Sequence, residues 1–106
     1  SPASDARFKK NIKDTDLGLD FIKELRPVSY QMTTDTDDRL SYGFIAQEVE
    51  KTLGDKKTKI IETEKTDEGY KYMRYNDIIP ILTKAIQEQQ EQIEDLKKEI
   101  ELLKSN

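Results

Sequence analysis

The chain has 106 residues, of which 38% are charged and only 34% hydrophobic, and its formal net charge is −4. An acidic chain lacks the basic face that duplex nucleic acid requires, and the absence of Cys and His excludes disulfides, the usual zinc ligands and histidine-based catalysis. No apolar run approaches the roughly 18 residues of a membrane-spanning helix, so we expect no membrane, nucleic-acid or metal partner.

The first part of the chain predicts an extended arm followed by short mixed elements. Residues 1–12 are small, polar and basic, which is typical of an extended arm. Apolar residues at helical spacing predict a helix in residues 17–25, and Pro27 ends it by forcing the preceding residue into extended geometry. Alternating side chains predict a strand in residues 28–32, and the Thr- and Asp-rich stretch 33–38 predicts a solvated loop.

The next segments predict a second helix and a β-hairpin. We expect a short buried strand at residues 42–45 and a helix at residues 46–53 that ends at Gly54. Residues 60–64 and 70–75 flank the turn sequence Thr-Asp-Glu-Gly, which indicates a hairpin. The predicted fold class is therefore α+β, a small mixed unit of short strands and helices.

The C-terminal third carries a sustained heptad pattern. Asn76 can cap a helix, Asp77 suits the positive end of its dipole, and Pro80 falls in the first turn, where its missing N–H costs little. We divide the chain into an α+β unit, residues 1–75, and a coiled-coil helix, residues 76–106. The seam of that helix, with one polar position, consists of Ile79, Leu82, Ile86, Gln89, Ile93, Leu96, Ile100 and Leu103.

The heptad has two interpretations. An amphipathic helix could pack on its own domain, but the strict 3.5-residue period and a length of roughly 40 Å favour self-association. Self-association also suits a chain with so few apolar residues, which would be only marginally stable alone. Ile at one seam position and Leu at the other favour two strands, and the polar Gln89 fixes the register without deciding the number of chains.

The N-terminal arm holds the residues that could carry chemistry. A serine needs a base to become a nucleophile, and in a chain without His the available base is a neutral lysine. Ser4 and Lys9 lie five residues apart, and Arg7 and Lys10 could supply the positive charge that, together with burial, lowers the pKa of a lysine. By spacing alone, however, the favoured interpretation is a solvated basic arm.

Four segments of the chain resemble, in order, one known family. They are SDARFKKNI, LDFIKELRPVSY, GFIAQEVE and YNDIIPILTKAIQEQQEQIEDL, and the resemblance covers nearly the whole chain. The family is the self-cleaving intramolecular chaperone at the C-termini of phage tail spikes, endosialidases and neck appendage proteins, which is also found in eukaryotic myelin regulatory factors. Phe8 and Met32 depart from its pattern, where Leu and an aromatic residue are more usual.

The resemblance implies a homotrimer, in place of the dimer that the heptad alone favours. It also implies that the domain helps an upstream β-rich stem of the same polypeptide to trimerise, in the host cytoplasm during phage assembly, and then releases itself from the virion protein. The Ser-Lys dyad of the family maps to Ser4 and Lys9. We therefore expect a single-turnover serine peptidase whose cleavage requires no cofactor.

The expected cut lies between Ala3 and Ser4, with the lysine accepting the hydroxyl proton and later protonating the leaving amine. The residues ahead of Ser4 leave a second possibility, a scissile bond before Ser1, although that serine lacks the surrounding motif. The oxyanion formed during the cut needs hydrogen-bond donors, for which Gln47 and backbone N–H groups near Gly43 are candidates.

The supporting residues of this site also have plainer interpretations. Gln47 and Glu48 could equally be ordinary residues at the start of a helix. Asp5 could orient the arm, but we favour a merely solvating role for it.

Two rival functions remain beside the self-cleaving chaperone. A passive coiled-coil trimerisation module explains the heptad but leaves Ser4 and Lys9 without a role. A nucleotide-regulated release module would use Lys56, Lys57 and Lys59 to hold phosphates, but the chain has no glycine-rich phosphate loop, and a solvated loop is the favoured interpretation of these lysines.

Overall fold

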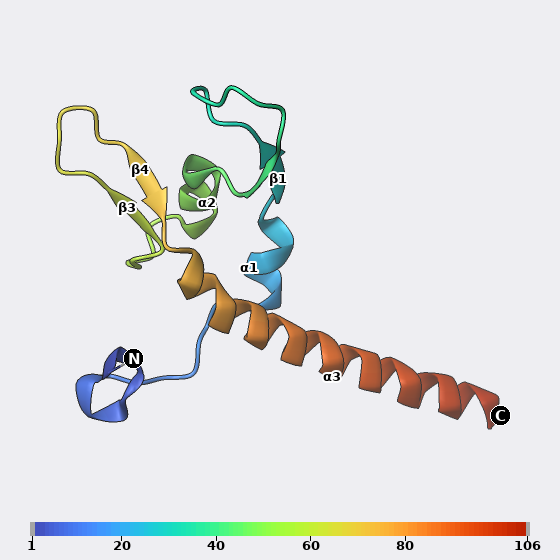
Figure 1. Cartoon of the computed structure of the whole chain (residues 1–106). Helices are drawn as coiled ribbons and strands as arrows, with labels where there is room; N and C mark the ends of the chain where they lie inside the picture. Colours follow the sequence, from blue (N-terminus) through green and yellow to red (C-terminus); the bar gives the residue numbers. More distant parts are fainter. Residues whose placement is uncertain (1, 106) are drawn as a thin grey trace.

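The computed structural model describes residues 2–105 and shows a small α+β head from which one long helix projects (Figure 1). The molecule measures 65 × 44 × 29 Å along its principal axes. The predicted α+β class is confirmed. The elements in chain order are the 3-10 turns η1 (Pro2–Ser4) and η2 (Ala6–Phe8), α1 (Leu19–Glu24), β1 (Val28–Tyr30), β2 (Ser41–Gly43), α2 (Ala46–Leu53), β3 (Ile61–Thr63), β4 (Lys71–Met73), the 3-10 turn η3 (Tyr75–Asp77) and α3 (Ile78–Lys104).

The strands form two separate antiparallel ribbons of two strands each. In the first ribbon Val28 of β1 lies opposite Gly43 of β2. In the second, Ile61 of β3 lies opposite Met73 of β4, and Gly69 in the connecting turn has a φ of 58°, a left-handed conformation that glycine adopts without strain. The predicted hairpin between β3 and β4 is therefore confirmed.

A small hydrophobic core joins the helices and the second ribbon. Its members come from α1, α2, the residue before β3 and the first turns of α3, and each is at most 7% exposed. Partly buried side chains, including Phe44 and Leu53, pack around this cluster. The core side chains are Phe21, Val49, Ile60, Ile78 and Ile81.

Helix α1 is shorter than the predicted range of residues 17–25. It begins at Leu19 because the carboxylate of Glu88, on α3, accepts the Leu19 N–H at 3.0 Å and so satisfies one of the free donors at the helix start. It ends at Glu24, since Leu25 is already extended. The expected helix exists, but a contact with α3 sets where it begins.

Helix α2 matches its predicted boundaries. Gly54 ends the helix with a φ of 64°, and its N–H donates to the Glu50 carbonyl at 3.1 Å. A positive φ is a conformation that glycine adopts without strain.

The sequence predicted an extended arm, but the arm contains the two 3-10 turns η1 and η2 and is therefore not extended throughout. Asp5 causes the second turn, since its carboxylate accepts the Arg7 N–H at 2.9 Å and caps η2. Beyond Lys9 the chain runs to α1 without a helix or strand. The alternative cut before Ser1 concerns a residue outside the described range.

The prediction of a buried strand at residues 42–45 was wrong about burial. The strand β2 forms, but the Tyr42 side chain is 77% exposed and Ile45 is also exposed. A ribbon of two strands is too narrow to cover both of its faces, so one row of side chains stays in solvent. The preceding strand also stops at Tyr30, because Met32 turns the chain by donating its N–H to the Asp35 carboxylate at 2.8 Å.

The start of α3 also differs from the sequence prediction. Asn76 does not cap the helix, because it lies inside η3, whose backbone passes directly into α3. The residue before the helix, Asp77, is itself in helical geometry and makes no side-chain cap bond. Pro80 lies in the first turn, as predicted. Within residues 2–105, no helix combines the length and the apolarity that a membrane crossing demands.

Candidate active site

The candidate nucleophile and base both lie on the N-terminal turns. Ser4 is the last residue of η1, and Lys9 directly follows η2, with its N–H donating to the Ala6 carbonyl at 3.2 Å. Both side chains are exposed in the single protomer. A lysine acts as a base only in its neutral form, which burial favours. The protomer therefore carries both groups on one short segment without the burial that the chemistry needs.

Asp5 and Arg7 hold the turn between these two groups. The Arg7 Nη2 lies 2.7 Å from Asp5 Oδ2, and its Nε lies 3.2 Å from both carboxylate oxygens. The hydrogen bonds that the Arg7 side chain and backbone donate lower the pKa of Asp5, and the Asp5 carboxylate that accepts them raises the pKa of Arg7. Asp5 thus orients the arm instead of merely solvating it, and it balances the charge of Arg7.

The root of the arm, residues 15–19, is fastened to the head. The Lys56 amine pairs with the Asp16 carboxylate, which lowers the pKa of Asp16. The Thr15 hydroxyl accepts the Leu17 N–H at 3.1 Å, and the Leu19 N–H is held by Glu88. Lys56, Lys57 and Lys59 are all exposed, and the contact with Asp16 gives Lys56 a structural role.

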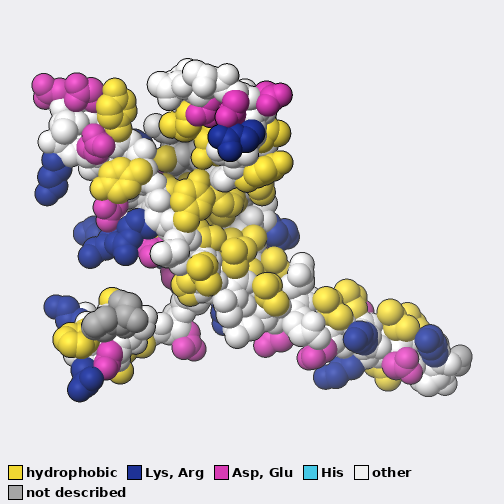
Figure 2. Space-filling view, viewed as in Figure 1, with side chains coloured by type: hydrophobic (Ala, Val, Ile, Leu, Met, Phe, Trp, Pro, Cys, Tyr) yellow, Lys and Arg dark blue, Asp and Glu magenta, His cyan; other side chains and the backbone are white. Residues whose placement is uncertain are grey.

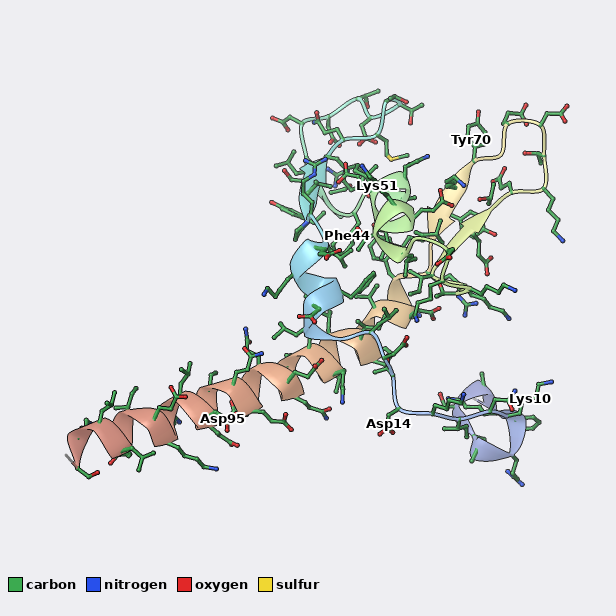
Figure 3. All side chains as sticks on the ribbon, turned by 180° about the vertical axis from the view of Figure 1, so that it is seen from behind. Lys10, Asp14, Phe44, Lys51, Tyr70 and Asp95 are labelled. Carbon is green, nitrogen blue, oxygen red and sulfur yellow. The ribbon has the colours of Figure 1, made fainter. Side chains whose placement is uncertain are left out.

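Gln47 and Glu48 lie in the first turn of α2, which the protomer holds apart from the N-terminal turns (Figures 1 and 3). Figure 3 shows Lys10 on the arm, well separated from Phe44 and from Lys51 on α2. Gln47 is exposed. In a single chain, Ser4 and Lys9 lie on the same short segment, and neither lies beside the residues of α2.

Glu48 instead forms a bidentate ion pair that the sequence did not reveal. Its two carboxylate oxygens accept from Arg26 Nε at 2.9 Å and Nη2 at 2.6 Å. The hydrogen bonds lower the pKa of Glu48 and raise that of Arg26. The pair joins the segments LRPVSY and GFIAQEVE, which are 22 residues apart at this contact, and no local spacing predicts such a contact.

The space beside this ion pair is too small for a substrate. A cavity of about 30 Å³ lies between Arg26, Phe44 and Glu48, which is room for about one water molecule. Among residues 2–105, no cluster of three or more acidic side chains is arranged to hold a metal ion.

The predicted coiled-coil seam lies on the outside of α3. Its apolar members are all exposed in the protomer, although the core takes up neighbouring residues of the same helix. Figure 2 shows apolar side chains repeating along the projecting part of the helix. The exposed seam residues are Ile79, Leu82, Ile86, Ile93, Leu96, Ile100 and Leu103, and Gln89 is exposed among them.

Comparison with known proteins gives one match. The family described as the chaperone of endosialidase, a peptidase family, matches residues 4–58, which is more than half of the chain. The matched range begins at Ser4 and contains the arm, β1, β2 and α2. Neither the curated proteins nor the solved structures gave a match.

Proposed function

Because the chain belongs to the chaperone-of-endosialidase family, we propose that it is an intramolecular chaperone that assembles as a homotrimer and then cuts itself from the polypeptide ahead of it. The substrate of the chaperone is an upstream β-rich stem of a phage tail-spike or appendage protein. The work takes place in the host cytoplasm during phage assembly, and the domain leaves the finished virion protein after the cut.

The exposed seam of α3 is the observation that supports self-association. Seven large aliphatic side chains at heptad spacing face solvent along a helix of 27 residues. If the seam packed on the head of the same chain, the seam residues would be buried. Instead, α3 buries the row that begins at Ile78. An apolar stripe of this length in water favours association with other copies. The family membership favours three copies over two.

The proposed cut uses only groups of the chain and one water molecule. The Ser4 Oγ bonds to the carbonyl carbon of Ala3 and gives its proton to the Lys9 amine. The bond from that carbon to the Ser4 nitrogen then breaks, and the lysine returns the proton to the leaving amine. Water hydrolyses the resulting ester, which leaves a carboxylate on Ala3 and a free α-amine on Ser4. No metal or nucleotide takes part in these steps.

Assembly would control the cut through burial of Lys9. Desolvation disfavours the charged form of a lysine and lowers its pKa, so an amine buried between protomers can lose its proton. The arm of the single protomer is exposed, and Asp5 already balances Arg7. The burial must therefore come from neighbouring chains. Misassembled chains would keep their chaperone, and correctly assembled chains would lose it.

The test uses the chain with its natural upstream segment. The wild type should give a shorter product over time, with Ser4 as its new N-terminal residue, and should be trimeric in analytical ultracentrifugation. Ser4→Ala and Lys9→Ala should stay uncut but trimeric, because both side chains are exposed and hold no part of the core. Lys13→Ala, an exposed lysine on the same segment, is the matched control and should be cut normally.

Two outcomes would contradict parts of this proposal. If the wild type assembles but never shortens, the domain is a passive trimerisation module, the rival that the exposed seam alone supports. If Ser4→Ala and Lys9→Ala lose the trimer, the two residues are structural and the peptidase mechanism is wrong.

A further inference from the structure

The heptad row of α3 extends one step further back than the helix itself. Tyr75 lies seven residues before Leu82 and four before Ile79, so it takes the next seam position towards the N-terminus. It belongs to η3, whose backbone runs directly into α3, and its side chain is 46% exposed. The row of exposed apolar side chains thus reaches the head at Tyr75.

Tyr75 is held rigidly against the first ribbon. Its hydroxyl accepts the Phe44 N–H at 3.1 Å, and the two rings lie 6.2 Å apart between centroids. A Cβ at Gly43 would lie 2.4 Å from the same hydroxyl oxygen, so only glycine allows this approach. The end of the seam and the strand β2 therefore form one fixed surface.

An open apolar groove lies next to this contact. It has a volume of about 500 Å³, and its walls include Pro27, Tyr42, Phe44 and Tyr75. The Tyr42 side chain, which lines the groove from the middle of β2, is 77% exposed. Figure 2 shows apolar side chains running without interruption from the head onto the first turns of α3. Contiguous apolar surface of this kind marks an interaction site.

We infer that a second copy of this chain covers the groove, so that the interface between protomers continues from the seam of α3 through Tyr75 onto the head. The inference rests on the proposed trimer. Tyr75 is both a seam residue and a wall of the groove, so a chain that packs on the seam necessarily lies beside the groove. The proposed arrangement is parallel, which places the heads of the copies at the same level.

This surface gives the head a direct part in sensing assembly. The groove takes part of its lining from the segments LRPVSY and GFIAQEVE, which also carry the ion pair of Arg26 and Glu48. Contact between copies at the groove would therefore involve the same two segments that the ion pair connects to α2. A coiled coil alone would leave the heads of the trimer independent of one another.

Cysteine labelling can test this inference, because the chain has no cysteine of its own. Tyr42→Cys places a thiol at the groove, and Tyr70→Cys is the matched control, a 65% exposed tyrosine beside the β3–β4 hairpin (Figure 3). In the assembled protein, a maleimide should label the thiol at position 42 about tenfold more slowly than the thiol at position 70, since thiol reactivity follows exposure. Adding Leu96→Asp, which disrupts the seam, should make the two rates equal.

A second measurement does not depend on a thiol. Tyr42→Ser should weaken association of the copies about tenfold or more, whereas Tyr70→Ser should leave it unchanged, because buried aromatic side chains dominate protein interfaces. Both sites are exposed in the protomer, so neither change disturbs its core. If the wild type is trimeric and both thiols label equally fast, the inference is wrong and the proposed trimer stands. If the wild type is monomeric, the proposed function itself fails.

Discussion

Two faces of α3 that begin one residue apart have opposite environments. Ile78 is 4% exposed and packs with Phe21 and Val49 in the core, whereas Ile79 is 61% exposed. The inner row continues through Ile81 and Ala85, both buried, and the outer row through the seam. The first turns of one helix thus face the head on one side and solvent on the other, while the second half of the helix projects alone.

This difference separates residues that form the core of the protomer from apolar residues that the fold leaves in solvent. The inner row is short because α1 covers only the first turns of α3 (Figure 1). The outer row keeps its period over the whole helix, past the point where the head ends. A row that outlasts its own domain cannot be explained by packing within that domain.

The comparison is most sharply tested by replacing the same residue type on each face. Ile78→Ala should lower the free energy of unfolding of the protomer by about 2–5 kcal/mol, because it leaves a cavity in a small core. Ile79→Ala should change it by less than about 0.5 kcal/mol, since the side chain is largely in water. Urea unfolding in a monomeric background carrying Leu96→Asp measures both values without the contribution of association.

When association is measured instead of unfolding, Ile79→Ala should have the larger effect of the two variants. Without Leu96→Asp, Ile79→Ala should weaken the oligomer in analytical ultracentrifugation. If both changes destabilise the monomeric background equally, the two faces do not differ and the exposed row belongs to the fold.

A smaller effect is expected where the inner side of α3 touches α1. A Cβ at Gly18 would lie 1.9 Å from Glu88 Oε1, so Gly18→Ala displaces the carboxylate that caps α1 through Leu19. The loss of this cap should cost about 1 kcal/mol in urea unfolding. Glu88→Ala should cost a similar amount, and the double variant should cost little more than either single one. Additive effects would show that the two residues act independently.

The smallest effect concerns the surface pair of Arg26 and Glu48, which should respond to pH. Hydrogen bonds from Arg26 lower the pKa of Glu48 below its ordinary value of 4.5 in the folded state. The stabilisation is therefore present above pH 4.5 and is lost as the pH falls through the lowered folded value. Glu48→Gln should be less stable than the wild type at neutral pH, and the difference should vanish in acid.

Urea midpoints across the acid range measure this difference, with Glu68→Gln on the exposed hairpin turn as the control. The control should follow the wild type at each pH, because Glu68 is exposed and lies outside the head's ion pairs. A difference between wild type and Glu48→Gln that persists unchanged below the folded pKa would assign the effect to packing instead of charge.

Local sequence signals predicted the elements whose causes are local. Gly54 ended α2 where the pattern placed it, and the hairpin of β3 and β4 formed around its turn sequence. The local signals failed at two other positions. Asn76 did not cap α3 because η3 runs into the helix, and Tyr42 stayed exposed because its ribbon has no third strand.

The candidate site divides in the same way. Ser4 and Lys9 follow from the arm motif, and the structure keeps them on one short segment. The 3-10 turns η1 and η2, the second of which Asp5 and Arg7 hold, were not expected. The pairing of Glu48 with Arg26 was also missed, because a separation of 22 residues leaves no periodic signal. The roles proposed for Ser4 and Lys9 in cleavage stay predictions.

The sequence by itself determined the heptad row, the end of α2, the hairpin and the family resemblance, because periodicity and turn chemistry act between residues close in the chain. Only the tertiary structure decided which face of α3 turns inward, where α1 begins, and how Tyr75 joins the seam to β2. Those contacts connect residues 31 and 69 positions apart, and they depend on how the elements pack. Packing also decided which apolar side chains of α3 were left in solvent.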